Sequence, residues 1–341
     1  MTMRQFGNGV VGLCLMSLLF SSCGGEKVNP PAETPKSIET IKPTHVAAPD
    51  FNADSAYAFV KVQADMGPRT PGSKAHEAAV NYYERKLKSY GAEVVVQKAT
   101  VTTFDNKKWL CKNVIASFNP ENPSRILLSA HYDSRPFCDR DSVKENEKKA
   151  CPGVNDGASG VAALIEIARL ISLNKIAVGI DIALWDLEDY GAGELDLATD
   201  NGMDDDWALG SQYWSKNPHK PGYIAKYGIL LDMVGGKNTA FPSETNSVFY
   251  AGTVKDKVWN TAANLGYADY FITRKCEVMD DHVYINRLAN IPCIDIIGYQ
   301  KDDNKFFPQH HTIRDDISTI DKNTLKAAGQ TVLEVIYNET P

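Results

Sequence analysis

Residues 125–130 read Arg-Ile-Leu-Leu-Ser-Ala, an apolar run of strand length, and His131-Tyr132-Asp133 follows it directly. Residues 180–185 (Ile-Asp-Ile-Ala-Leu-Trp) form a second such run, which leads into Asp186-Leu187-Glu188-Asp189. Between the two runs, residues 158–171 have the length and apolar content of a helix. Apolar strands that alternate with helices are typical of a sheet covered on both faces. This stretch therefore predicts an α/β fold.

The same alternation continues on both sides of this stretch. Further strands are expected at residues 228–231 and 293–297, and further helices at residues 75–90, 255–265 and 321–337, the last capped by Asp321. We predict a single domain, residues 51–341, with a central mixed and mostly parallel sheet covered by helices on both faces.

Composition limits the class of protein. The chain has 341 residues, of which 43% are hydrophobic and 23% are charged, as in globular proteins. Lys and Arg total 36 against 43 Asp and Glu, which gives a net charge of −7. Because nucleic-acid binding requires a basic surface, we expect no nucleic-acid partner.

The N-terminal segment has the pattern of an export signal. Arg4 precedes the apolar run 10–20, which is too short to span a bilayer, and small residues lead into Cys23. We interpret residues 1–22 as a lipoprotein signal peptide, Cys23 as the lipidated residue and residues 23–50 as a Pro-rich tether. A plain secretory signal is the alternative. The expected location is the periplasm, with a lipid anchor in the outer membrane.

Export affects how the seven cysteines are interpreted. Cys14 would leave with the signal peptide, and five cysteines would remain in the folded domain. Cys138 and Cys151 flank a loop rich in charged residues. The sequence leaves two alternatives open: a disulfide between these cysteines, or two free thiols.

Polar side chains follow the predicted strands, where ligands bind in open α/β sheets. Taken singly, Asp156 is explained as a helix cap and Glu188-Asp189 as a solvated turn. Together with Asp232 at the end of the third strand and His311 late in the chain, they predict one site. Carboxylates and histidine suit Zn²⁺.

Six motifs in order resemble the zinc-dependent glutaminyl cyclases of the animal type, which share a fold with the zinc aminopeptidases. They are HYDS (131–134), NDGASG (155–160), LWDLEDYG (184–191), LLDMVG (230–235), MDDH (279–282) and HHT (310–312). Residues 67–73 (GPRTPGS) match an early segment of the same family. The resemblance covers the chain from about Phe51 to its end.

The resemblance implies an activity and a set of roles. The reaction is conversion of the N-terminal Gln of peptides and proteins to pyroglutamate, with release of ammonia, by an expected monomer. One zinc ion per chain would be bound by Asp156, Asp189 and His311, with Glu188 as the proton shuttle and Asp232 and Asp280 as a buried acid pair. Apart from peptides, the membrane is the only partner expected, through the lipid anchor.

Several positions depart from the animal pattern. Asp189 stands where those enzymes carry glutamate, and His310 where they carry tryptophan. We expect His310, Phe306 and Trp207 to line the substrate pocket. His131 is a further metal-competent residue, for a second metal or for support, and a dinuclear zinc aminopeptidase is therefore the alternative. Residues 200–206 are oxygen-rich but lack EF-hand spacing, which favours a solvated acidic loop over a calcium site.

Overall fold

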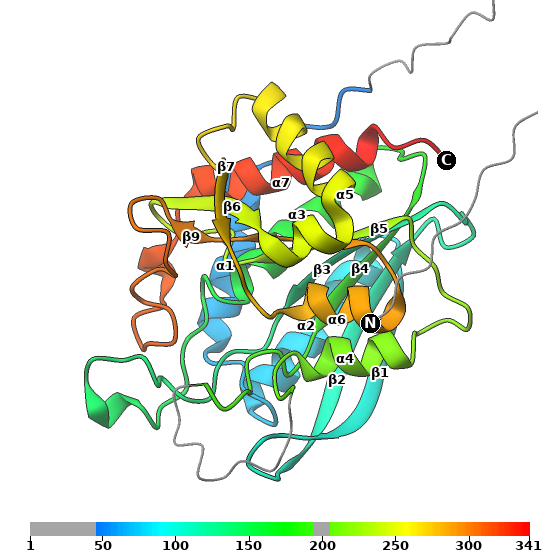
Figure 1. Cartoon of the computed structure of the whole chain (residues 1–341). Coiled ribbons are helices and arrows are strands. Elements are labelled where there is room, and N and C mark those ends of the chain that lie inside the picture. Colours follow the sequence, from blue (N-terminus) through cyan, green and yellow to red (C-terminus); the bar gives the residue numbers. More distant parts are fainter. Residues whose placement is uncertain (1–45, 194–204) are drawn as a thin grey trace, which may run out of the picture. The chain divides into compact units, whose positions relative to one another are not determined.

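The computed structural model describes residues 46–193 and 205–341 (Figure 1). The predicted signal peptide, Cys23, the tether up to residue 45 and residues 194–204 lie outside the described residues, including most of the oxygen-rich stretch. Within the described part, no helix combines the length and apolar character needed to cross a membrane.

A six-stranded mixed sheet forms the centre of the fold. Its strands follow the spatial order β1 (Glu93–Thr102), β2 (Lys108–Phe118), β4 (Gly179–Trp185), β3 (Arg125–His131), β5 (Tyr227–Asp232) and β8 (Cys293–Ile297). The last four strands in this order pair in parallel, whereas β1–β2 and β2–β4 pair antiparallel. The predicted α/β fold with a mixed, mostly parallel sheet is confirmed.

The strands predicted from apolar runs are β3, β4, β5 and β8, which are fully buried. The β1–β2 hairpin was missed. In β1 at the edge of the sheet, most residues are partly or fully exposed, so its apolar content is diluted by charged and polar residues such as Gln97 and Lys98. An exposed edge strand lacks the continuous apolar run by which a central strand is recognised.

Helices cover both faces, as predicted. The larger apolar core lies between the sheet and α1 (Ala53–Met66), α2 (Lys74–Ser89), α3 (Ala158–Leu173), α5 (Thr245–Asn264) and α7 (Lys322–Tyr337). On the opposite face, α4 (Leu209–Lys216) and α6 (Asp281–Ala289) pack together, with Trp214 and Ile285 in a second core (Figure 1). The sequence did not predict α1, α4 or the helical state of α6.

Helix ends follow from capping residues. The Asp321 side chain accepts a hydrogen bond from the backbone N–H of Asn323, which confirms the predicted cap of α7. The helix expected at 255–265 lies in the second part of α5. The element starts at Thr245, where Glu244 accepts N–H bonds from Asn246 and Ser247, and its backbone is non-helical at Ala251. A three-stranded sheet of β7 (Phe271–Cys276), β6 (Thr239–Glu244) and β9 (Tyr299–Gln300) completes the fold.

Candidate active site

A cavity of about 180 Å³ lies where β4 and β5 end, next to the start of α3. Its lining includes five acids and two histidines predicted from the sequence: Asp156, Glu188, Asp189, Asp232, Asp280, His310 and His311. Parallel strands bring their carboxyl ends to one edge of a sheet, which explains why residues far apart in sequence meet here.

The three predicted zinc ligands lie together. His311 Nε2 is 3.1 Å from Asp189 Oδ1 and 3.5 Å from Asp156 Oδ2. Both carboxylate oxygens of Asp189 are buried, and neither accepts a well-directed hydrogen bond. Because a buried carboxylate normally has partners, this arrangement fits ligands that converge on a cation. Two carboxylates and one imidazole, with room beside them, match an open Zn²⁺ site.

A second group of metal-competent atoms shares Asp156. His131 Nε2 lies 3.1 Å from Asp156 Oδ1 and 3.2 Å from Asp232 Oδ1, and all three side chains are buried. Burial lowers the pKa of His131, but the carboxylates of Asp133, Asp156 and Asp232 outweigh it and hold the pKa well above the usual value. His131 therefore contacts both Asp156 and Asp232, and its role, in support of Asp156 or as a ligand to a second metal, stays a prediction.

Glu188 lies in an environment that favours its protonated form. Its side chain is 12% exposed. Burial raises its pKa well above the ordinary value; the nearby His131 opposes this shift, and the charges of Asp280 and Asp189 add to it. A carboxyl group that is easily protonated is suited to accept and return a proton during a reaction.

Asp232 and Asp280 line the same cavity. Burial raises the pKa of Asp232 to about 7, His131 opposes the shift, and the charge of Asp280 increases it. The Asp280 side chain also accepts the N–H of Asp281 as the N-cap of α6. The two acids thus lie close enough to interact electrostatically, and His131 is the side chain that contacts Asp232 directly.

The structure brings the three predicted wall residues to the cavity. Trp207 stacks on His311, with ring centroids 6.2 Å apart and planes 8° from parallel. Phe306 packs on His310 with a centroid separation of 4.5 Å. His310 also lies near the metal group, because its Nε2 is 3.5 Å from Asp156 Oδ2. Burial and the charge of His311 lower the pKa of His310 well below its usual value, so it is neutral.

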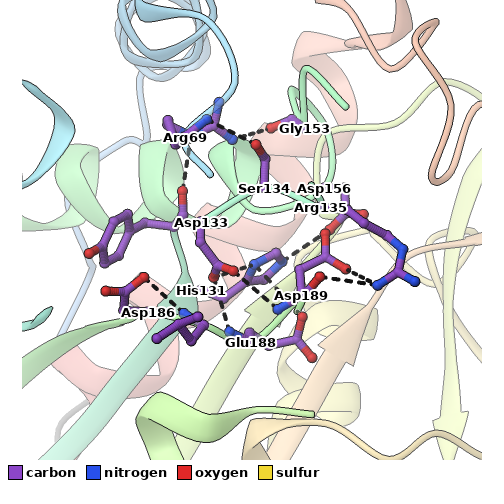
Figure 2. A network of polar contacts seen from close by, with 12 residues as sticks. Arg69, His131, Asp133, Ser134, Arg135, Gly153, Asp156, Asp186, Glu188 and Asp189 are labelled. Carbon is purple, nitrogen blue, oxygen red and sulfur yellow. Dashed lines mark hydrogen bonds and ion pairs between the residues drawn. The ribbon is translucent and has the colours of Figure 1, made fainter. Parts of the chain in front are cut away.

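Sequence reasoning missed the acids that hold the ligand-bearing loops. Asp133 accepts the backbone N–H groups of Glu188 and Asp189, at 3.1 and 3.2 Å (Figure 2). Asp315 accepts those of Asn155 and Asp156, at 2.9 and 3.0 Å. Asp133 stands within the quoted HYDS motif, whereas no motif pointed to Asp315.

A third missed acid contacts His311, one of the predicted zinc ligands. Asp139 Oδ1 lies 3.5 Å from His311 Nδ1, and its carboxylate is 3% exposed. Arg135 binds the same carboxylate through Nε at 2.7 Å and Nη2 at 2.5 Å. Its Nη1 also donates to the backbone carbonyl of Asp189 at 3.1 Å. One Arg–Asp pair therefore contacts two of the predicted ligand residues.

The backbone is left-handed at several points of the site. Leu187, Met233 and His311 have φ values of 53°, 51° and 55°, although none is glycine. Gly157 has φ 85°, and a Cβ there would lie 3.0 Å from His131 Cε1. The glycine of the NDG motif thus allows the histidine of the HYDS motif to approach Asp156.

Cys138 and Cys151 are buried free cysteines whose Sγ atoms lie 2.7 Å apart. The predicted disulfide therefore has its partners in place but remains a prediction. Cys111, Cys276 and Cys293 are buried as well.

The class of protein follows from comparison with known families. The model of peptidase family M28 matches residues 113–336, and the chain belongs to that family. This range spans the strands and loops that carry all the candidate zinc ligands.

Two solved structures resemble the chain over its described fold. A glutaminyl cyclase from Bacteroides thetaiotaomicron, bound to N-acetylhistamine, is 48% identical with a TM-score of 0.83. A Zn-dependent exopeptidase from Parabacteroides distasonis has the same identity and TM-score. Each alignment covers 86% of this chain and 100% of the other.

Curated relatives are more distant. An aminopeptidase of Bacillus subtilis is 26% identical over 301 residues, which cover 84% of this chain; the chain spans only 58% of that relative's length. A glutaminyl-peptide cyclotransferase of Gloydius blomhoffii is 24% identical over 326 residues, covering 81% of this chain and 80% of the relative.

Proposed function

We propose that this chain is a glutaminyl-peptide cyclotransferase, which converts the N-terminal Gln of peptides to pyroglutamate and releases ammonia. One arrangement carries the proposal: Glu188, with its raised pKa, lines the same small aromatic-walled cavity as Asp156, Asp189 and His311. The similarity to a solved glutaminyl cyclase across nearly the whole described chain supports it.

We assign one zinc ion to Asp156, Asp189 and His311. When bound, zinc would polarise the γ-amide carbonyl of the substrate and stabilise negative charge on its oxygen. The neutral imidazole of His310 lies beside this group and would complete the wall of the pocket.

Glu188 is the proton shuttle in this proposal. The α-amine of the substrate forms a bond to its own γ-carbonyl carbon, and the bond from that carbon to the amide nitrogen breaks. Glu188 accepts the proton that the amine loses and passes it to the departing nitrogen. Asp232 and Asp280 line the same cavity and would accept hydrogen bonds from the amine. Because the nucleophile belongs to the substrate, the enzyme requires no Ser or Cys nucleophile.

The aromatic wall favours cyclisation over hydrolysis. Trp207 and Phe306 line the same cavity as Glu188, so a peptide that packs against these rings would displace water from the site. With water excluded, the tethered amine of the substrate is the nucleophile closest to the carbonyl carbon.

Aminopeptidase activity is the second candidate, and one observation favours it. His131, Asp156 and Asp232 form a group that would hold a second metal beside the first. In a dinuclear site, Glu188 would activate a water molecule and the first peptide bond would be hydrolysed. The similarity to the aminopeptidase of Bacillus subtilis is consistent with this alternative.

Mass spectrometry separates the two activities. The zinc-loaded chain is incubated with a dipeptide that begins with Gln and with one that begins with Leu. We expect the Gln dipeptide to lose one ammonia and the Leu dipeptide to remain intact. Release of free amino acids from either peptide would support the aminopeptidase instead.

A variant tests the assigned role of Glu188. Glu188→Gln keeps the size of the side chain and removes its ability to carry a proton, so we expect loss of turnover with zinc still bound. Elemental analysis of the variant provides the control for metal content. Substantial residual cyclisation would refute the role of Glu188 as proton shuttle.

We also propose that the chain is an exported lipoprotein of the periplasm, because residues 1–23 combine Arg4, a short apolar run and small residues before Cys23. Cys23→Ala should abolish incorporation of radiolabelled palmitate during expression in a bacterium. If the wild-type chain takes up no label, the plain secretory signal becomes the better interpretation.

A further inference from the structure

Cys138 and Cys151 are positioned to bond to each other. Their residues are 0% and 2% exposed, and their Sγ atoms are 2.7 Å apart. A disulfide requires a separation of about 2.05 Å. The sulfur atoms would therefore need to move by much less than the length of one bond.

The backbone already holds the two cysteines in this relation. The N–H of Cys138 donates to the carbonyl of Lys149 at 2.9 Å, and the N–H of Cys151 donates to the carbonyl of Arg135 at 2.9 Å. Backbone hydrogen bonds thus join the two ends of the 138–151 loop. A bond between the sulfurs would preserve this pairing rather than distort it.

We propose that Cys138 and Cys151 form a disulfide that holds Arg135 and Asp139 against the zinc-binding residues. In forming it, the two thiols lose two protons and two electrons to a small-molecule disulfide such as oxidised glutathione, which leaves as two thiols. The role of the disulfide in positioning Arg135 and Asp139 rests on the zinc site of the proposed function. The formation of the disulfide does not depend on that function.

Chemistry indicates when the bond would form. The adjacent Cys138 thiol and burial both raise the pKa of Cys151, so the folded thiol is a poor nucleophile. Because both cysteines are buried in the folded chain, we expect the exchange to take place during folding, before the loop closes over the sulfurs.

The segment that the bond fixes contacts both ligand-bearing loops. Asp139 lies beside the imidazole of His311, and Arg135 donates to the carbonyl of Asp189. The N–H of Arg140 donates to the carbonyl of His311 at 3.3 Å. Loosening residues 135–140 would therefore displace two zinc ligands at once.

Peptide mapping tests the bond. The full chain is denatured without reductant, alkylated with iodoacetamide and digested with trypsin, which cuts at Arg140, Lys144, Lys148 and Lys149 between the two cysteines. We expect the two cysteine peptides to remain linked and to separate after reduction. If both cysteines carry the alkyl group before reduction, the proposal is wrong.

Zinc affinity tests the positioning role independently of cyclase activity. Reduction of the wild-type chain with a phosphine should weaken zinc binding about tenfold. The Cys138→Ala/Cys151→Ala variant should show the weakened affinity without reductant and no further change with it. Cys293→Ala, which removes a buried thiol elsewhere, serves as the matched control. If the mapped bond is reduced and zinc affinity stays constant, the positioning role is refuted.

Should the double variant not fold, the reduction of the wild-type chain decides the question alone. A failure of the proposed cyclase activity would leave the mapping and the zinc measurement unaffected, so the two failures are distinguishable.

Discussion

Replacing Asp139 with Asn tests how the zinc histidine is oriented. The carboxylate of Asp139 lies 3.5 Å from Nδ1 of His311, while Nε2 of the same ring points to Asp156 and Asp189. A carboxylate on the far nitrogen of a metal-binding histidine fixes the orientation of the ring and increases the basicity of the ligand nitrogen. Asp139→Asn keeps the shape of the side chain but removes its charge.

The size of the effect follows from the neighbours of Asp139. A full charge at this distance from the imidazole would be worth about 5 kcal/mol at an effective dielectric constant of about 20. Arg135 binds both oxygens of the carboxylate and offsets most of that charge. We therefore expect the smaller loss typical of such residues, about 1.4–2.7 kcal/mol, or 10–100-fold in zinc affinity.

Competition with a fluorescent zinc chelator measures this loss, and thermal melting checks that the variant is folded. Asp141→Asn is the matched control, because Asp141 belongs to the same loop and accepts the N–H of Ile313 without contacting the imidazole. Unchanged zinc affinity in Asp139→Asn would refute the reasoning. An equal loss in both variants would show that the carboxylates act by ordering the loop.

Further expectations concern zinc, the substrate and stability. Burial lowers the pKa of His311, but the carboxylates around it outweigh burial and raise the pKa to about 9. Below that pH, zinc must displace a proton from the imidazole. Zinc affinity measured in chelator titrations should therefore rise about tenfold per pH unit up to about pH 9 and then level off. Trp207→Ala should raise KM for a Gln peptide up to about tenfold in steady-state assays, since the ring lines the cavity. Gly157→Ala should lower the free energy of unfolding in urea by at least about 1 kcal/mol, because φ there is 85°. If Cys138 and Cys151 are bonded, reduction should lower the free energy of unfolding by about 3 kcal/mol, seen as a shift of the urea midpoint.

The central strands were predictable from sequence because burial on both faces leaves a simple pattern. The segments 125–130 and 293–297 are mainly apolar, with Arg125, Ser129 and Asp295 as their polar residues, and the structure places them in β3 and β8. The antiparallel β1 and the helix α4 carry mixed polarity, since each is partly exposed. Their identity depends on tertiary contacts, which no local pattern encodes.

The site was predictable to the extent that its residues follow strands. Asp189 and Asp232 come after apolar runs, and the structure brings both to one cavity. Asp139 and Asp315 lie in irregular loops, and their partners are remote in sequence. Asp315, for example, contacts the backbone of Asn155 across 160 positions. The function of such residues depends on loop paths that the sequence pattern does not specify.

The left-handed residues show what holds the reactive groups in place. An L-residue in this conformation costs about 1–2 kcal/mol, and Leu187 adopts it immediately before Glu188. The turn directs the backbone N–H groups of both Glu188 and Asp189 to the buried carboxylate of Asp133. Hydrogen bonds to a charged acceptor contribute about 1.5–3 kcal/mol each, so two of them offset the strain. The orientation of Glu188 and Asp189 therefore depends on Asp133, which does not line the cavity and acts through the backbone of the turn.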